Sequence, residues 1–190
     1  QLAAVIGRMF FYRVLAAIAQ EEQQLSTRLL ILQREELIRE RARMPELEYV
    51  FKHELTREAA YNGLLKQERR TYHRQVAEAL ERLFADRVEE QVSLLAYHWE
   101  QAEVPEQAIK YLLQAGEQAR RSYANEEAID DYKRALRILD AAELGGTQKD
   151  WELEARGALG KIYAATGHAA EAEPYLREAI ALGKTIGAAT

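Results

Sequence analysis

The stretch that decides the fold is Leu153–Ile186, which reads LEARGALGKIYAATGHAAEAEPYLREAIALGKTI. Its apolar residues recur at helical spacing on both sides of Gly167, a residue type that favours the turn between two helices. The stretch therefore predicts one helix-turn-helix unit of about 34 residues. A unit of this kind cannot bury its apolar face alone, so we expect it to stack on neighbouring units.

Several positions in this unit follow the pattern of a tetratricopeptide repeat. In chain order they are Leu159, Gly160, Tyr163, Gly167, Ala172, Leu176 and Ala179. The repeat ends four residues before the last residue, and the sequence begins with Gln1 rather than Met. We therefore expect the chain to be a segment of a longer repeat protein.

Amphipathic stripes predict four further helices upstream, over residues 69–84, 88–102, 105–119 and 125–139. With the two helices of the final repeat, they give six consecutive helices from about residue 69 to 186, the pattern of an α-solenoid. Pro105 is predicted in the first turn of its helix, where proline is best tolerated. Asn125 and Asp150 are predicted as N-caps, and Gly145-Gly146 is expected in a loop of about nine residues.

The front of the chain has a different pattern. Apolar clusters predict short helices over Ala3–Ile6 and Val14–Ile18, and a longer one over Leu25–Leu37. Two segments with strand-forming residues, Ile38–Arg43 and Leu47–His53, flank the turn signal Met44-Pro45-Glu46 and predict a β-hairpin.

Thr56 is expected to cap a helix over Arg57–Leu65. Helices followed by a β-hairpin are typical of a winged-helix-like module. We therefore predict a mainly α fold with two domains. Residues 1–66 form the winged-helix-like module with one β-hairpin, and residues 67–190 form a tetratricopeptide-type α-solenoid whose clearest repeat is 153–186.

The composition is that of an ordinary globular chain, with a net charge of −5 and no cysteine. Residues 1–87 hold 15 Lys and Arg against 13 Asp and Glu, whereas residues 88–190 hold 11 against 18. Neither half has the strong positive charge of a nucleic-acid-binding domain. The absence of cysteine excludes disulfides and thiolate metal sites, and it favours a cytoplasmic location. No apolar run approaches the roughly 20 residues that cross a bilayer.

Three stretches of the sequence, Ala4–Phe10, Phe51–His73 and Tyr123–Ala128, resemble a known family. The chain is similar to the segment that follows the nucleotide-binding domain in bacterial STAND-type signalling ATPases. It is most similar to those that join an adenylate or guanylate cyclase domain, a predicted ATPase and tetratricopeptide repeats. The resemblance covers nearly the whole chain.

The resemblance implies a position in a larger protein rather than an activity. The winged-helix-like module would pack beside the ATPase, and the repeats would act as a sensor or docking arm. ATP would bind the parent protein, and we expect no cofactor, metal or catalytic residue in this segment. Its partner would be another protein or a neighbouring domain of the same chain.

Two other functions stay open. The segment could belong to a transcription regulator with the same ATPase and repeat layout. Alternatively, it could be a self-contained scaffold whose repeats form a homo-oligomer.

The usual geometry of such repeats would direct one side of each first helix, with Gly157 and Ala165 in the last repeat, into a concave face. The candidate interaction residues on that face are Lys110, Glu117, Arg121, Glu154 and Lys161. This set lacks the dense Lys and Asn clamp of repeats that grip a C-terminal carboxylate, so it identifies no particular peptide.

A second candidate surface is the densest basic patch, at residues 66–74. We expect either that it pairs with nearby glutamates or that it contacts a neighbouring ATPase domain. The candidate interdomain residues are His53, Lys66, Arg69, Arg70 and His73. His53 and His73 are expected to be partly buried hydrogen-bonding groups at the junction of hairpin and helix.

Other motifs do not predict chemistry. Gly183-Lys184-Thr185 lacks the glycine that a phosphate-binding loop needs five residues earlier, where Glu178 stands, so it is interpreted as a helix end. No two histidines have the i, i+4 spacing of a helical metal site. The candidate DNA-reading helix would be 24–37. Its Arg28 and Arg34 are offset by Glu35 and Glu36, which argues against direct DNA binding.

Overall fold

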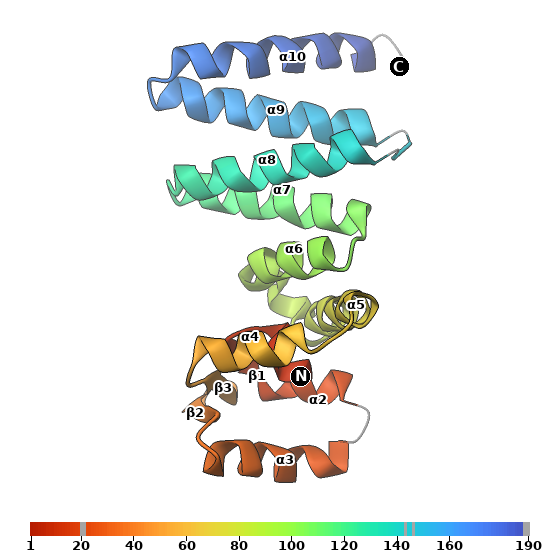
Figure 1. Cartoon of the computed structure of the whole chain (residues 1–190). Coiled ribbons are helices and arrows are strands. Elements are labelled where there is room, and N and C mark those ends of the chain that lie inside the picture. Colours follow the sequence, from red (N-terminus) through yellow and green to blue (C-terminus); the bar gives the residue numbers. More distant parts are fainter. Residues whose placement is uncertain (20–21, 143, 146, 188–190) are drawn as a thin grey trace. The chain divides into compact units, whose positions relative to one another are not determined.

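The computed structural model describes residues 1–19, 22–142, 144–145 and 147–187, and most of them are helical (Figure 1). Within those residues the chain forms ten α-helices, one 3-10 helix and three short β-strands. The prediction of a mainly α fold with a small β-hairpin is confirmed at this level. No described helix combines the length and the apolar character that crossing a membrane would require.

The described chain divides into two compact units. The first holds Gln1–Gln91 with Gln101–Glu103, and the second holds Val92–Glu100 and the chain from Val104 onward. Helix α5 (Lys66–Leu83), which the sequence analysis places in the second domain, packs against α1 and α2 in the first unit. The assignment of residues 1–66 and 67–190 to two types of domain stays a prediction.

The first unit begins with α1 (Leu2–Ile6), β1 (Met9–Phe11), α2 (Tyr12–Ile18) and α3 (Glu22–Arg34). The two short helices predicted here are confirmed, whereas β1 between them was not predicted. The third helix ends at Arg34 rather than at Leu37, because Glu36 has a left-handed backbone with φ of 57° that a helix cannot continue through.

The three strands form one antiparallel sheet in the order β1-β3-β2. The predicted hairpin is present as β2 (Ile38–Ala42) and β3 (Glu48–Phe51), and β1 adds to the other edge of β3. Phe10 of β1 stacks on Tyr49 with ring centroids 5.7 Å apart, and Phe51 lies at the same distance from Phe10. This aromatic cluster is the core of the sheet.

Helix α4 (Glu54–Asn62) follows β3 almost directly. The predicted N-cap at Thr56 is wrong, because the helix begins at Glu54 and His53 takes the N-cap position. Helix α5 begins at Lys66, earlier than predicted, and the Glu68 carboxylate accepts a hydrogen bond of 2.8 Å from the backbone N–H of Leu65. Its buried side carries Val76 and Leu80, as the stripe predicts.

The predicted helix over 88–102 is wrong in its first part. Residues Ala85–Gln91 form a 3-10 helix in which Arg87 has non-helical φ and ψ of −144° and 40°. The α-helical part is α6 (Val92–Gln101), in which Leu95 and Trp99 are buried.

The second unit is built mainly from two antiparallel helix pairs, α7 (Pro105–Arg121) with α8 (Asn125–Ala141) and α9 (Gln148–Ala165) with α10 (Ala169–Gly187) (Figure 1). Pro105 is the first residue of α7, as predicted. The predicted N-caps Asn125 and Asp150 are wrong, because both residues lie inside their helices. The N-cap positions are taken by Ala124 and Thr147. The α8–α9 loop is shorter than predicted, and Gly146 lies outside the described residues.

The turns of the two helix pairs repeat each other at a spacing of 44 residues. Tyr123 and Gly167 are counterparts and have positive φ of 60° and 83°. The next residue in each turn donates its N–H back to the first helix, from Ala124 to the Ala119 carbonyl at 2.9 Å and from His168 to the Tyr163 carbonyl at 2.8 Å. The two helix pairs therefore share one turn geometry at a spacing of 44 residues, whereas the sequence predicts a repeat unit of about 34 residues.

Close packing within each pair repeats as well. A Cβ atom added to Gly116 would lie 3.0 Å from the Tyr132 ring, and one added to Gly160 would lie 2.6 Å from Leu176. These two glycines, also 44 residues apart, let the second helix of each pair approach the first. Helix α9 contacts both α8 and α7, so the second pair packs on the first.

Candidate interaction surface

Helix α7 carries three of the candidate interaction residues on its solvent side. Lys110 and Arg121 are exposed, and Glu117 is half-buried between them. The Lys110 ammonium group lies 4.7 Å from the centre of the Tyr111 ring, a cation–π distance. Helical geometry brings residues three and four apart together, which places Arg120 and Arg121 beside Glu117.

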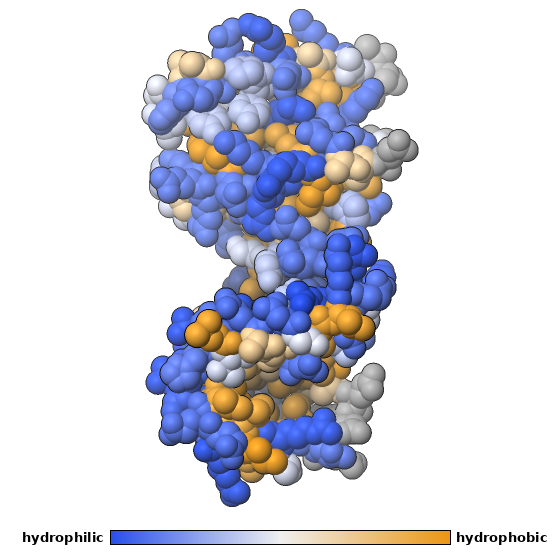
Figure 2. All heavy atoms as spheres, in the orientation of Figure 1, coloured by the Kyte–Doolittle hydropathy of each residue, from blue (hydrophilic) through white to orange (hydrophobic). Residues whose placement is uncertain are grey.

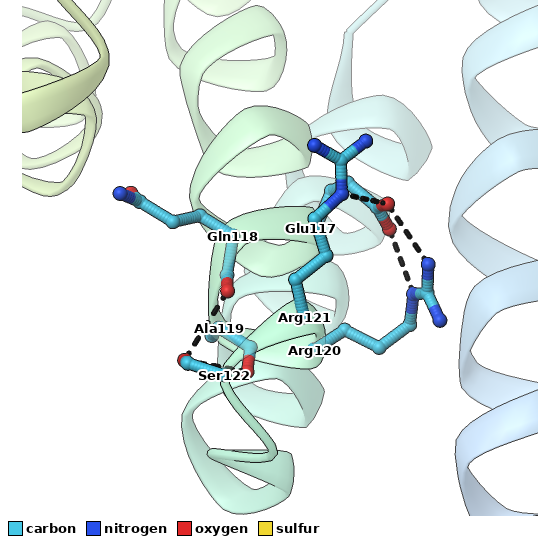
Figure 3. A network of polar contacts seen from close by, with 6 residues as sticks. All are labelled: Glu117, Gln118, Ala119, Arg120, Arg121 and Ser122. Carbon is cyan, nitrogen blue, oxygen red and sulfur yellow. Dashed lines mark hydrogen bonds and ion pairs between the residues drawn. The ribbon is translucent and has the colours of Figure 1, made fainter.

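The Glu117 carboxylate holds both arginines (Figure 3). Arg120 donates two hydrogen bonds to it, of 2.7 and 2.8 Å, and Arg121 donates one of 2.8 Å. These hydrogen bonds, first from Arg120 and then from Arg121, lower the pKa of Glu117 to about 2 against the opposing effect of burial. The carboxylate therefore stays ionised, and the three side chains together carry a net positive charge.

Helix α9 contributes Glu154 to the same surface. Glu154 is exposed on one side, but partial burial of its carboxylate raises its pKa. The negative charge of Glu117 raises this pKa further. Tyr132 of α8 is buried near both carboxylates, and its pKa is raised by burial first and then by the charges of Glu117 and Glu154. The structure thus brings together Glu117 and Glu154 from two different helices.

Lys161 lies two turns after Glu154 on α9 and is exposed. We call the surface formed by Lys110, Glu117, Arg120, Arg121, Glu154 and Lys161 the α7–α9 surface. Arg120 was missed in the sequence, although its i+3 spacing from Glu117 could have identified it. Tyr132 was assigned only to the core stripe, where it does lie.

The candidate interdomain residues lie in the first unit. His73 is fully buried in α5, and its Nε2 lies 3.0 Å from the Tyr61 hydroxyl. Burial first, and then the nearby positive charge of Arg69, lower the pKa of His73 to about 4. His53 is exposed, so the expectation that it is partly buried is wrong. Its backbone carbonyl accepts the first hydrogen bonds of α4 while its ring is left in solvent.

The basic patch is engaged by neighbouring groups of the same unit. Arg70 forms an ion pair with Glu103, and the Lys66 ammonium lies 3.6 Å from the same carboxylate. Arg69 donates to the backbone carbonyls of Leu64 and Asn62 at 3.0 and 3.1 Å. Pairing with a glutamate is therefore present for Lys66 and Arg70, whereas contact with an ATPase domain stays a prediction.

The remaining motifs of the sequence can now be placed in the structure. Gly183, Lys184 and Thr185 lie within α10, and the Thr185 hydroxyl donates to the Leu182 carbonyl at 2.7 Å. Across residues 1–19, 22–142, 144–145 and 147–187, no group of three or more His, Asp or Glu side chains is placed to hold a metal ion.

The surface shown in Figure 2 is mostly hydrophilic over the helices of the second unit, with hydrophobic residues in separate patches. Comparisons with protein-family models, curated proteins and solved structures found no match to this chain. The functional argument therefore depends on the residues and their geometry.

Proposed function

We propose that this chain is a non-catalytic regulatory and protein-interaction segment that binds a protein partner in the cytoplasm through its α7–α9 surface. The observation that carries the proposal is the Glu117 cluster. The Glu117 carboxylate accepts hydrogen bonds from both Arg120 and Arg121, and so orients two exposed guanidinium groups before a partner binds. Fixed polar groups bind with a smaller loss of side-chain entropy than mobile ones.

The repeated helix pairs support a tetratricopeptide-type solenoid. The two pairs share the same turn and the same glycine contact at equal spacing, and α9 packs on both helices of the pair before it. Units that stack in this way present one side of their first helices as an extended binding surface. The α7–α9 surface is such a side, because both α7 and α9 are first helices.

The element order of the first unit supports the winged-helix-like module. Helix α3 is followed directly by the β2–β3 hairpin, and β1 completes a small sheet beside the helices. In the proposed parent, a STAND-type and cyclase-linked ATPase, this module would adjoin the ATPase. Partner binding to the repeats would favour one arrangement of the neighbouring ATPase or effector domain, which is a shift in population between states.

The position in a larger protein is tested by determining the reading frame that encodes this chain and about 400 residues upstream of it, a length that holds two or more ordinary domains. A Gly-x-x-x-x-Gly-Lys-Ser/Thr loop after a strand supports the ATPase, and a cyclase domain supports the effector. An upstream DNA-binding domain in place of the cyclase would support the transcription-regulator alternative. A frame with no such loop contradicts the STAND assignment.

The binding surface is tested with peptides selected from a random display library on the immobilised chain. Their affinities are then compared between the unmodified chain and a variant with Arg121→Glu and Lys161→Glu. We expect the dissociation constant to rise at least about tenfold, since both substitutions reverse charge at the surface.

The matched control carries Arg137→Glu and Arg82→Glu, two exposed positions on α8 and α5 with the same total change of charge. This control should bind as the unmodified chain does. Equal loss of affinity in both variants would show a general charge effect. Loss only in the control would place the binding surface elsewhere.

A further inference from the structure

Three residues other than glycine have a left-handed backbone in the described chain, and Tyr123 differs from the other two. Glu36, with φ of 57°, forms an ion pair with Lys52 at 3.1 Å. Glu103, with φ of 54°, forms an ion pair with Arg70. Tyr123 has a φ of 60°, and its side chain has no hydrogen bond, ion pair or ring contact with any residue that the structure describes. The two glutamates therefore stabilise the fold through their side chains, whereas the Tyr123 ring makes no such contribution.

The turn between α7 and α8 does not require this ring. The counterpart turn has Gly167 at the same position, with the same backbone hydrogen bond from the residue that follows. Tyr123 is 87% exposed, and none of the other nine tyrosines exceeds the 39% of Tyr97. A bulky residue with this backbone is an outlier, and residues strained in this way cluster at ligand-binding sites. The ring is therefore available to a binding partner.

Tyr123 lies at one end of the α7–α9 surface. It follows Arg121 by two residues, so the two Cα atoms are at most about 7.6 Å apart. Arg121 donates to Glu117 through Nε, and its two terminal nitrogens point away from that carboxylate (Figure 3). Across the described ranges these two nitrogens have no acceptor. Their fork can therefore take a carboxylate from outside the chain, beside the exposed ring.

The charge of the α7–α9 surface indicates the chemistry of the partner. Two carboxylates on this surface, those of Glu117 and Glu154, face an excess of cations. The four cations are Lys110, Arg120, Arg121 and Lys161. A partner that complements this surface is therefore acidic.

We propose that Tyr123 is a partner-binding residue of the α7–α9 surface, and that the partner is an acidic protein segment with an apolar side chain beside its carboxylates. The inference rests on the proposed function, because it adds a contact residue and a partner chemistry to that surface. A carboxylate of the segment pairs with Arg121, and the apolar side chain covers the ring of Tyr123. Tyrosine and arginine are among the residue types that contribute most to the affinity of protein interfaces.

The test uses the peptides selected from the display library and measures their dissociation constants by titration calorimetry. We expect peptides rich in Asp and Glu with an apolar residue close by. Tyr123→Gly and Tyr123→Asn remove the ring and suit a left-handed backbone, and each should raise the dissociation constant at least about tenfold. Tyr123→Phe keeps the ring and should stay within about twofold. Leu55→Ala, at an apolar position 78% exposed on α4, is the matched control and should bind as the unmodified chain does.

Two further measurements separate a binding role from a structural one. Urea denaturation should show Tyr123→Gly to be at least as stable as the unmodified chain, although it binds the peptide more weakly. A tyrosine that only supported the fold would lose stability and affinity together. The photoreactive residue p-benzoylphenylalanine should cross-link to the peptide from position 123 and not from position 55.

The variant with Arg121→Glu and Lys161→Glu, measured on the same peptides, distinguishes this inference from the proposed function. Weaker binding in that variant but not in Tyr123→Gly would overturn the inference and leave the proposed surface standing. Unchanged binding in both would overturn the two together. Loss in Tyr123→Gly alone would place the partner away from the α7–α9 surface and overturn both. A selection that enriches no acidic peptide would overturn the partner chemistry.

Discussion

At the scale of single residues, Tyr123 is the most unusual feature of the second unit. It has a φ of 60° and is 87% exposed, whereas its counterpart in the next helix pair is Gly167. A left-handed backbone costs roughly 1–2 kcal/mol for residues other than glycine. The turn geometry therefore favours glycine at both positions, and the sequence supplies it at only one.

We expect replacement of Tyr123 by glycine to stabilise the second unit. Tyr123→Gly should raise the free energy of unfolding of the second unit by about 1 kcal/mol, because glycine relieves the backbone strain. Gly167→Ala should lower it by a similar amount. Both tryptophans, Trp99 and Trp151, belong to the second unit, so urea denaturation followed by tryptophan fluorescence measures these changes. A loss of stability in Tyr123→Gly would show that the tyrosine ring makes a stabilising contact.

The buried His73 makes the first unit sensitive to acid. Its pKa of about 4 lies below the ordinary value near 6.5, so the unfolded chain takes up a proton first as the pH falls. The contribution of His73 to stability is complete above pH 6.5 and is lost as the pH falls toward 4. The total loss is at most about 3 kcal/mol.

His73→Gln should flatten this pH dependence, whereas His53→Gln at the exposed N-cap of α4 should leave it as it is. The measurement is urea denaturation by far-UV circular dichroism at several pH values. Both tryptophans lie in the second unit, so the part of the circular-dichroism transition that tryptophan fluorescence does not follow reports the unfolding of the first unit. If the free energy of unfolding of His73→Gln falls with decreasing pH as steeply as that of the unmodified chain, the acid sensitivity belongs to other groups.

At the scale of elements, Arg134 joins α6 to α8 within the second unit. Its guanidinium forms an ion pair with Glu100 of α6 and donates to Asp131 of α8 at 3.0 Å. Arg134 and Asp131 are largely buried, and burial raises the pKa of Asp131 to about 6 although Arg134 opposes the shift. Removing the arginine would leave two carboxylates close together without their shared cation.

We expect Arg134→Gln to lower the free energy of unfolding of the second unit by about 2 kcal/mol. A double-mutant cycle with Glu100→Gln should give a coupling energy of about 1 kcal/mol. Arg137→Gln, at an exposed position one turn later on the same helix, is the control and should change stability by less than about 0.5 kcal/mol. Additive effects of Arg134→Gln and Glu100→Gln would mean that the ion pair does not join the two helices.

The helices could be predicted because their apolar residues recur at regular helical spacing. The hairpin could be predicted because strand-forming residues flank the turn signal Met44-Pro45-Glu46. Ala128, Tyr132, Ala135 and Leu139 were placed on one buried stripe, and all four are buried. Strand β1 was missed because three residues carry no period, and it forms only by pairing with β3, which lies about 40 residues later. The caps at Thr56, Asn125 and Asp150 were wrong because each helix begins at an earlier residue, whose side chain makes no capping hydrogen bond.

The candidate site could be predicted only in part. Helical spacing in a single helix gave Lys110, Glu117 and Arg121, and the structure keeps them on one helix. The closeness of Glu117 to Glu154 depends on how α9 packs against α7, which follows from contacts that the sequence does not specify.

At the scale of the whole molecule, the proposed role predicts that the chain is catalytically silent. A purified sample should neither hydrolyse ATP nor form cyclic nucleotides, because the ATPase and cyclase motifs are expected in other parts of the parent protein. Phosphate release and cyclic-nucleotide formation are measured beside a blank purified in the same way from cells that lack the chain. Either activity, if it coelutes with the folded chain, contradicts the proposal of a non-catalytic segment.

The most direct test of the central claim is backbone amide exchange of the chain with and without a selected peptide, read by mass spectrometry. Amides exchange more slowly where a bound ligand prevents local opening. If the account holds, added protection is concentrated in α7 and α9, and it disappears in the chain with Arg121→Glu and Lys161→Glu. Protection confined to the first unit, or to α10, would contradict the assignment of partner binding to the α7–α9 surface.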